Sequence, residues 1–257
     1  MSTFLYLRMA DMVCHVPPSM NFIMSALLEK FFSSGQPGRK LLDLLQAATP
    51  EVYATGVRGS APAFFTAQLF DMLQRHILFV CPSFEEAQAL FEEMLFYRSS
   101  GIPDEALAAA EVLLFPPLET QAYEDVLSHC DISSQRLWTL YRLCEAQQPC
   151  LVVTSVRALL QKVLPADILI DACRTVRTGD TIDRDSLCAA LIACGYTRVS
   201  VVEDRGDLSI RGEVLDIFPP GYSRPVRIDF FGDAIESIRF FDAATQRSRE
   251  ELREVML

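Results

Sequence analysis

Residues 207–241 read DLSIRGEVLDIFPPGYSRPVRIDFFGDAIESIRFF. Apolar and polar side chains alternate through this stretch, which is typical of strands that bury one face of a sheet. Pro219-Pro220-Gly221 separates two of the strands, and Gly232-Asp233 joins the next two as a tight hairpin. The pattern predicts an α+β module rich in antiparallel hairpins. Its elements are a capped helix near 184–194 and strands at 198–202, 207–211, 213–218, 225–231 and 234–241.

The preceding residues have a different pattern, in which short apolar runs alternate with helical segments. This alternation favours an α/β unit with a mainly parallel sheet, led in by two helices around the breaker cluster SSGQPG at 33–38. A short strand, Val52-Tyr53-Ala54, is expected after those helices. The other expected strands are 77–81, 111–115 and 150–154, and the expected helices are 20–32, 39–48, 83–95, 132–146 and 156–163.

The charge balance argues against direct binding to nucleic acid. The chain of 257 residues has 34 acidic and 23 basic residues and a net charge of -11, which repels a phosphate backbone. The basic residues are unevenly distributed, because residues 174–257 hold 12 of them and all 12 are arginine. Arginine is enriched at protein interfaces, so this bias indicates a protein partner.

The cysteine and histidine residues suggest neither a disulfide framework nor a metal site. The eight cysteines contain no CxxC pair, as expected of free thiols in a reducing cytoplasm. His15, His76 and His129 lie far apart in the sequence, and we expect no catalytic nucleophile. Polar residues interrupt residues 1–20 well short of the roughly 20 residues that a membrane span needs. We therefore expect a cytoplasmic chain without membrane contact.

A glycine-containing segment at 56–63, GVRGSAPA, lies in a context suited to a phosphate-binding loop. Its spacing fits GxxxxGK[ST], with Gly56 in place and with Gly59 and Ser60 between the two glycine positions. Ala61 replaces the second glycine, Pro62 the lysine and Ala63 the hydroxyl residue that would hold Mg²⁺. An ordinary strand-turn-helix and a degenerate nucleotide loop both remain compatible with this segment, whereas a working ATPase does not.

Two longer motifs resemble one known family, the transcription-repair coupling factors, whose N-terminal region is similar to the repair protein UvrB. The first is LFPPLETQAYEDVLSHCDISSQRLWTLYRL at 114–143. The second, at 211–248, resembles the domain shared by UvrB and the coupling factors that docks onto UvrA. UvrB is the alternative identification, as a nucleotide-binding repair helicase subunit. It would carry an intact GSGKT loop and a tyrosine-rich hairpin where this chain has only Tyr123 and acidic residues.

The resemblance implies a domain organisation and a function. It implies a degenerate helicase-like, P-loop NTPase-type domain at 39–155 and a UvrA-interaction domain at 156–247, after a lead-in at 1–38 and before a truncated continuation at 248–257. Recruitment of UvrA would link stalled RNA polymerase to nucleotide excision repair. RNA polymerase, duplex DNA, ATP and Mg²⁺ would be bound by parts of the family's longer chains, so we expect no cofactor and no enzymatic activity here.

Four residues are expected to form the partner surface. Alternation along the strand 225–231 places Arg227 and Asp229 on one face, and Arg211 is expected near Arg227. On the strand 207–211, Ser209 and Arg211 are expected to face outward, and Gly212 to admit a bulge. The resemblance implies contacts with UvrA by Arg198, Arg211, Arg227 and Asp229. Ser209 departs from UvrB, which has arginine there, and the competing interpretation is a row of ordinary solvated charges.

Overall fold

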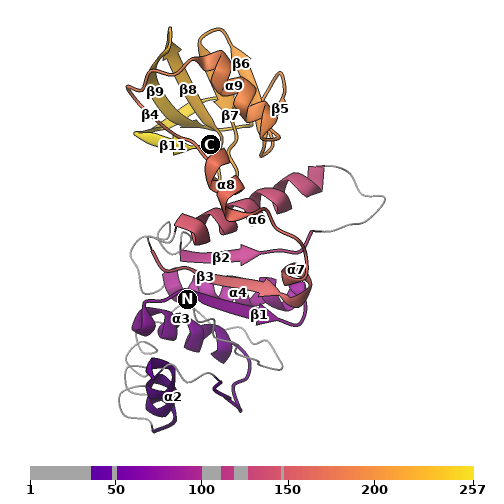
Figure 1. The fold of residues 1–257 in the computed structure, drawn as a ribbon, viewed down its shortest axis with the longest axis vertical. Coiled ribbons are helices and arrows are strands. Elements are labelled where there is room, and N and C mark those ends of the chain that lie inside the picture. The colour runs from indigo at the N-terminus through magenta and orange to yellow at the C-terminus, as the bar shows by residue number, and fades with distance from the viewer. Residues whose placement is uncertain (1–35, 48–50, 100–110, 119–126, 146–147) are drawn as a thin grey trace. The chain divides into compact units, whose positions relative to one another are not determined.

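The computed structural model describes residues 36–47, 51–99, 111–118, 127–145 and 148–257 (Figure 1). The chain divides into two compact units. Unit 1 comprises Met1–Pro117 with Glu145–Lys162, and unit 2 comprises Leu118–Cys144 with Val163–Leu257. The expected helix at 20–32, Tyr123 and the motif residues 119–126 lie outside the described residues. No helix in the described ranges is long and apolar enough to cross a membrane.

Unit 1 contains a parallel sheet with the strand order β1-β3-β2, as the alternating pattern predicted. Its strands are β1 (Ile77–Cys81), β2 (Val112–Phe115) and β3 (Leu151–Ser155). Every residue of β2 and β3 is buried, which explains their continuous apolar sequence. The helices are α2 (Gln36–Gln46), α3 (Ala61–Leu73), α4 (Phe84–Ser99) and α7 (Val156–Leu159).

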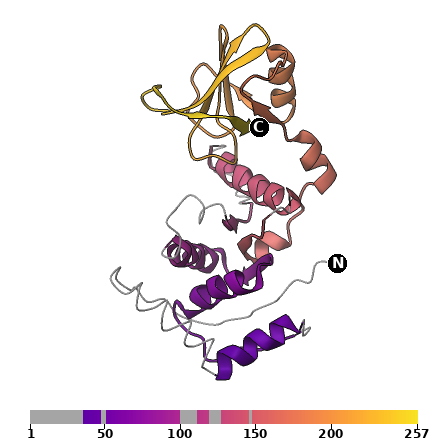
Figure 2. The same ribbon diagram turned by 90° about the vertical axis from the view of Figure 1, so that its left-hand side faces the viewer.

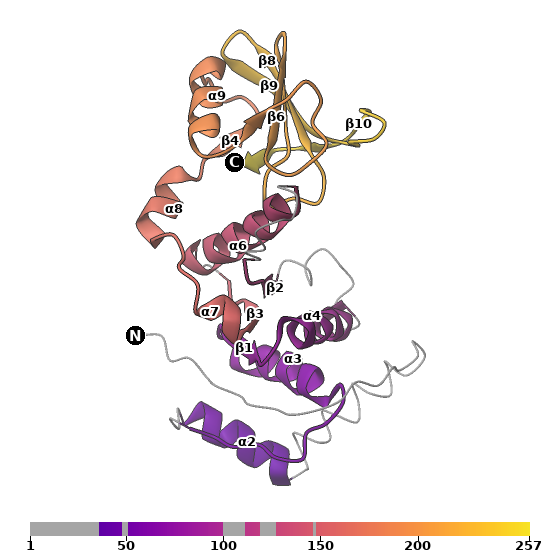
Figure 3. The same cartoon turned by 90° about the vertical axis from the view of Figure 1, so that its right-hand side faces the viewer.

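Helices α3 and α4 pack together against one face of this sheet (Figures 1 and 3). Leu69 of α3, Met94 of α4 and Leu151 of β3 are completely or almost completely buried in their shared core. Burial of each such side chain stabilises the fold by roughly 1.5–3 kcal/mol. Arg98 at the end of α4 is also buried, and it forms ion pairs with Asp71 and Glu111. These ion pairs tie both helices to the start of β2.

Two sequence predictions for unit 1 are wrong. Residues 52–54 form no strand, because this segment runs as irregular chain towards the glycine loop. The cluster at 33–38 is not wholly a loop, since α2 already begins at Gln36. Proline is tolerated in the first helical turn, where its missing N–H would have no helical partner anyway, so Pro37 does not delay the helix.

Unit 2 is built on a six-stranded sheet with the order β10-β9-β8-β7-β6-β5. All neighbours are antiparallel except β5 and β6. The strands are β5 (Thr197–Arg198), β6 (Asp207–Arg211), β7 (Val214–Ile217), β8 (Val226–Phe231), β9 (Ala234–Phe241) and β10 (Ser248–Leu252). A two-stranded antiparallel sheet pairs β4 (Thr175–Arg177) with β11 (Glu254–Met256).

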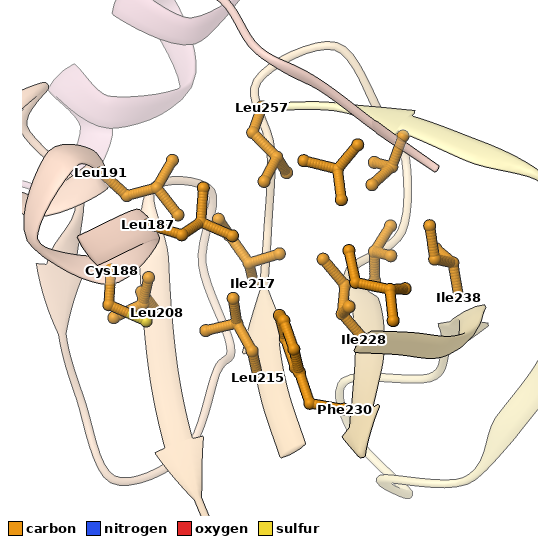
Figure 4. Packing of buried hydrophobic residues seen from close by; sticks show 14 residues of the cluster. Leu187, Cys188, Leu191, Leu208, Leu215, Ile217, Ile228, Phe230, Ile238 and Leu257 are labelled. Carbon is orange, nitrogen blue, oxygen red and sulfur yellow. The ribbon is translucent and has the colours of Figure 1, made fainter. Parts of the chain in front are cut away.

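Helix α9 (Arg184–Ala193) covers one face of the six-stranded sheet (Figures 2 and 3). Asp183 is its N-cap, and the Asp183 carboxylate accepts a hydrogen bond from the Ser186 N–H at 2.6 Å. Leu187 and Leu191 point from the helix into the sheet (Figure 4). The sheet contributes Leu208, Leu215, Ile217, Ile228, Phe230 and Ile238 to this core. One face of the sheet is therefore apolar, which leaves its polar residues on the other face.

Unit 2 also contains α6 (Leu127–Glu145), up to Cys144, and α8 (Ala166–Ala172). The Trp138 ring of α6 lies so close to Gly221 that a Cβ atom there would be 2.4 Å from it. Glycine is thus required at the turn after Pro219-Pro220 for steric reasons. An ion pair of 2.7 Å between Arg205 and Asp131 also joins α6 to the segment before β6.

Candidate partner-binding surface

The polar face of the six-stranded sheet has a row of polar and charged residues in register across four strands. Ser209 of β6 lies opposite Asp216 of β7, Asp216 lies opposite Arg227 of β8, and Arg227 lies opposite Arg239 of β9. Cross-strand partners point to the same face of a sheet, so these side chains form one row. The face opposite this row is the one that α9 covers.

Asp216 is at the centre of this row and is the residue that connects the predicted arginines. Its side chain is 1% exposed. Arg227 donates from Nε to Asp216 Oδ1 at 2.7 Å and from Nη2 to Oδ2 at 2.9 Å, while Arg211 donates from Nη2 to Oδ2 at 2.8 Å. The sequence prediction that Arg211 lies near Arg227 is therefore confirmed, and a shared carboxylate is the reason. We call Arg211, Asp216 and Arg227 the arginine cluster.

The two arginines of the cluster differ in exposure. The Arg227 side chain is 18% exposed, whereas that of Arg211 is 50% exposed. The Arg227 guanidinium also lies 4.7 Å from the centre of the Phe241 ring, a cation–π distance. Its hydrogen bonds to Asp216 raise the pKa of Arg227 above the ordinary value. Arg227 is thus held rigidly within the sheet face, and Arg211 is the more accessible cation.

The turn between β9 and β10 supports the cluster. Gln246 in this turn has a left-handed backbone, with φ of 58°, which is unusual for a residue other than glycine. Its carbonyl oxygen accepts from Arg227 Nη1 at 3.3 Å, and its side-chain oxygen accepts from Arg211 Nη2 at 3.3 Å. The strained turn therefore contacts both arginines of the cluster.

Asp229 lies on the same face as Arg227, as predicted, but its carboxylate is occupied within the sheet. Ser237 donates to its Oδ2 at 2.7 Å, and Arg239 forms an ion pair with the same oxygen. Burial alone would raise the pKa of Asp229, but these hydrogen bonds outweigh burial and hold the pKa below its ordinary value. Asp229 therefore neutralises Arg239.

Arg198 is not brought into the arginine cluster. It lies on the two-residue edge strand β5 opposite Leu208, whose side chain belongs to the core beneath α9. The predicted strand at 198–202 ends after Arg198, because the chain turns away to bury Val202 against Phe218 and Phe241. Register thus places Arg198 on the face opposite the cluster.

Two expectations about β6 are wrong. Ser209 is 2% exposed and donates to the carbonyl oxygen of Ser200 at 3.1 Å, so the segment after β5 covers it. Gly212 forms no bulge: Arg211 pairs directly with Val214 across a two-residue turn. The φ of 61° at Gly212 suits such a hairpin turn, for which glycine is favoured.

Among the residues of this face that sequence reasoning did not single out are Asp216 and Phe231. Asp216 is the one acid in the apolar run VLDIF, and a fully buried carboxylate needs charged partners, which was a usable signal. Phe231, which follows Arg227 and Asp229 in the alternation along β8, is 73% exposed. It places an uncovered aromatic ring at the hairpin end of the same strand.

The glycine segment of unit 1 differs from this surface, because the residues at the lysine and hydroxyl positions of its motif are buried. Gly56 and Gly59 have φ of 82° and 62°, and α3 begins at Ala61. Pro62 and Ala63 are buried, and Ala63 belongs to the core with 0% exposure. The Tyr97 hydroxyl group donates to Ser60 Oγ at 3.1 Å. The positions of the absent lysine and hydroxyl residue thus face protein.

No group of three or more His, Cys, Asp or Glu residues within the described ranges is arranged to hold a metal ion. The cysteines at 81, 144, 150, 173, 188 and 194 are free thiols.

The domain class follows from comparison with known families. Residues 175–257 match the family described as the UvrB interaction domain. This range contains α9, the six-stranded sheet and the β4–β11 pair. The arginine cluster of unit 2 lies within this matched range.

Comparison with individual proteins extends the relationship beyond this domain. The chain is 37% identical over 223 residues to the transcription-repair-coupling factor of Myxococcus xanthus, a match that covers 87% of this chain and 18% of the relative. The corresponding protein of Escherichia coli is 33% identical over 199 residues, covering 77% and 16%. That of Bacillus subtilis is 28% identical over 228 residues, covering 89% and 18%.

The chain is thus homologous to a part of the transcription-repair-coupling factors, and the recognition from its motifs is confirmed. It spans less than a fifth of the length of these curated relatives. The relatives favour a region of a coupling factor over the UvrB-like helicase subunit that was the alternative.

Proposed function

We propose that this chain is a UvrA-recruiting region, and that unit 2 binds UvrA through the polar face of its six-stranded sheet. Recruitment of UvrA would link stalled RNA polymerase to nucleotide excision repair. Contacts with RNA polymerase and duplex DNA, and the use of ATP and Mg²⁺, would belong to other parts of a coupling factor. The observation that carries the proposal is the arginine cluster within a UvrB interaction domain.

The exposed residues on this face support a protein interface. Arg211 is half exposed, and Phe231 is largely exposed on the same face. Arginine and aromatic residues are the side chains that most often carry the binding energy of protein interfaces. We therefore propose Arg211 and Phe231 as direct contacts, with Arg227 and Asp229 as supports beneath them. Arg198, on the opposite face, would make at most a separate contact.

For unit 1 we propose a degenerate P-loop NTPase-type fold without bound nucleotide or catalytic activity. The parallel sheet and the glycine turn before α3 support the fold. The burial of Pro62 and Ala63 supports the absence of nucleotide chemistry, because neither a cationic group nor a hydroxyl group is available there. The domain boundaries implied by the resemblance, 39–155 and 156–247, belong to the same proposal.

A titration of UvrA into the 257-residue chain, followed by calorimetry, tests the main proposal. Arg211→Ala is the informative variant, because it leaves the bidentate pair between Arg227 and Asp216 in place. Arg177→Ala is a matched control, since Arg177 is an exposed arginine with an ion pair to Glu254. We expect Arg211→Ala to weaken binding by about 2 kcal/mol and Arg177→Ala to leave it unchanged. Absence of binding by the folded parent chain would contradict the proposal.

Charge reversal at Arg227 is a poor test of the same site. A glutamate there would lie against Asp216, which is buried and would lose its main partner. An unpaired buried carboxylate is strongly destabilising. If such a variant failed to bind UvrA, unfolding of the chain would explain the result, and the binding site would remain untested.

A further inference from the structure

We propose that Asp216 is the positioning residue of the UvrA surface, and that it aims Arg211 at a carboxylate group of the partner. This proposal rests on the proposed function and adds the chemistry of the contact. Its starting point is the burial of Asp216 on a sheet face, where an apolar side chain would satisfy the fold. Replacement of a buried ion pair by apolar residues is often neutral or stabilising, so stability alone does not account for this carboxylate.

The hydrogen-bond donors of the two arginines are unequally used. Arg227 donates through Nε and Nη2 to Asp216, and through Nη1 to Gln246 and Ser248. Arg211 donates through Nη2 alone to Asp216 and Gln246. Its Nε and Nη1 atoms make no hydrogen bond with the described residues. Arg211 therefore has donors available for a partner, whereas all three nitrogens of Arg227 are engaged.

The charges of this face define the kind of group that those donors would bind. The arginine cluster joins two cations to one anion, which leaves one net positive charge at half-exposed Arg211. The neighbouring pair of Asp229 and Arg239 is neutral. A guanidinium matches a carboxylate geometrically through two parallel hydrogen bonds. The overall charge of -11 opposes nucleic acid, so an acidic side chain of a protein is the favoured group.

Asp216 would act by limiting the freedom of Arg211. A free arginine side chain loses rotamer entropy when it binds, and a side chain that is already held in place loses less of it. The bond to Asp216 and the bond to Gln246 hold one end of the guanidinium against the sheet. Removal of the carboxylate would leave the charge of Arg211 intact but would release its orientation.

A double-mutant cycle on UvrA affinity separates positioning from a purely structural role. The variants of the 257-residue chain are Arg211→Ala, Asp216→Asn and their combination, with Glu254→Gln as a control that removes an acid from the exposed pair with Arg177. We expect Asp216→Asn to weaken UvrA binding about tenfold. Adding Arg211→Ala to the Asp216→Asn variant should then reduce UvrA affinity much less than Arg211→Ala reduces it in the parent chain. Additive effects, or an Asp216→Asn variant that binds like Glu254→Gln, would overturn the proposal.

A second measurement does not depend on UvrA. NMR spectra of the arginine side chains should show Nε–H signals of Arg211 and Arg227 that both change in Asp216→Asn and stay constant in Glu254→Gln. Unchanged Arg211 signals would refute the positioning role even if UvrA binds. If the parent chain fails to bind UvrA, the proposed function fails, and these spectra still decide whether Asp216 orients Arg211.

Asp216→Glu covers the case in which Asp216→Asn does not fold. It keeps the charge and lengthens the side chain by one methylene group, so positioning predicts a folded chain with weakened UvrA binding. Full affinity in a folded Asp216→Glu variant would count against the proposal.

Discussion

The two units each contain a sequence pattern that suggests binding, and they differ in where the side chains lie. In unit 1, the glycine segment leads into α3, but Pro62 and Ala63 are turned into the protein. In unit 2, Arg211 and Phe231 remain exposed above a sheet whose other face is buried. The two segments thus differ in the accessibility of the side chains that would make contact with a ligand or partner.

The largest effects are expected from variants that alter the hydrophobic core of unit 1 or that of unit 2 separately. Leu151→Ala in unit 1 and Ile228→Ala in unit 2 both truncate completely buried side chains, so each should cost about 2–5 kcal/mol of unfolding free energy. Only Ile228→Ala should weaken UvrA binding near the melting transition. Chemical denaturation combined with the calorimetric titration checks both effects. Equal loss of UvrA binding in the two variants would contradict the assignment of the surface to unit 2.

Substitution of Arg227 should mainly lower stability, whereas substitution of Arg211 should mainly weaken UvrA binding. Arg227→Ala leaves Asp216 buried with only one partner, so it should lower the unfolding free energy by roughly 3 kcal/mol. Arg211→Ala removes a half-exposed partner and should cost less than about 1 kcal/mol, although it weakens UvrA binding more. Melting curves of the two variants provide the measurement. Equal destabilisation would show that the distinction between support and contact is wrong.

Substitution of Asp229 should have a smaller effect on stability, and this effect should depend on pH. Its pKa is lowered in the folded chain, so its contribution to stability is present above the unfolded pKa of about 4 and is lost as pH falls through the folded pKa. Asp229→Asn should therefore melt below the parent at pH 7, and the difference should narrow at pH 3. A constant difference across that range would contradict the role of the charge.

Addition of Mg-ATP should not change the melting temperature of the chain. A ligand at 100 times its Kd stabilises a protein by about 2.7 kcal/mol, which a melting curve resolves easily. Because the lysine and hydroxyl positions of the loop are occupied by buried Pro62 and Ala63, we expect no shift in Tm at millimolar Mg-ATP. A reproducible rise would show that unit 1 still binds nucleotide and would remove the contrast between the units.

Strands with clear alternation were predicted closely from the sequence. The predicted strand 207–211 matches β6, and the prediction 234–241 matches β9, because each strand buries one face against a core. The elements that were missed have no such signal. Strand β4 is three residues long and pairs with β11, about 80 residues away in the sequence, so only tertiary contacts define it. Helix α8 and strand β10 were missed as well.

The candidate site was predictable in part. Alternation alone placed Arg227 and Asp229 on one face, and this placement is confirmed. The pairing of strands decides what lies between them, and a single sequence does not reveal register. The role of Asp216 as the shared partner of Arg211 and Arg227 therefore required the structure. The partner roles of these residues stay predictions.

Hydrogen–deuterium exchange of the 257-residue chain with and without UvrA tests the central claim most directly. We predict that UvrA slows exchange in the turns that border the polar face, at 212–213, 232–233 and 242–247, and leaves residues 51–63 unchanged. Protection confined to residues 51–63, with none at those turns, would contradict the claim that the polar face of the six-stranded sheet is the binding surface.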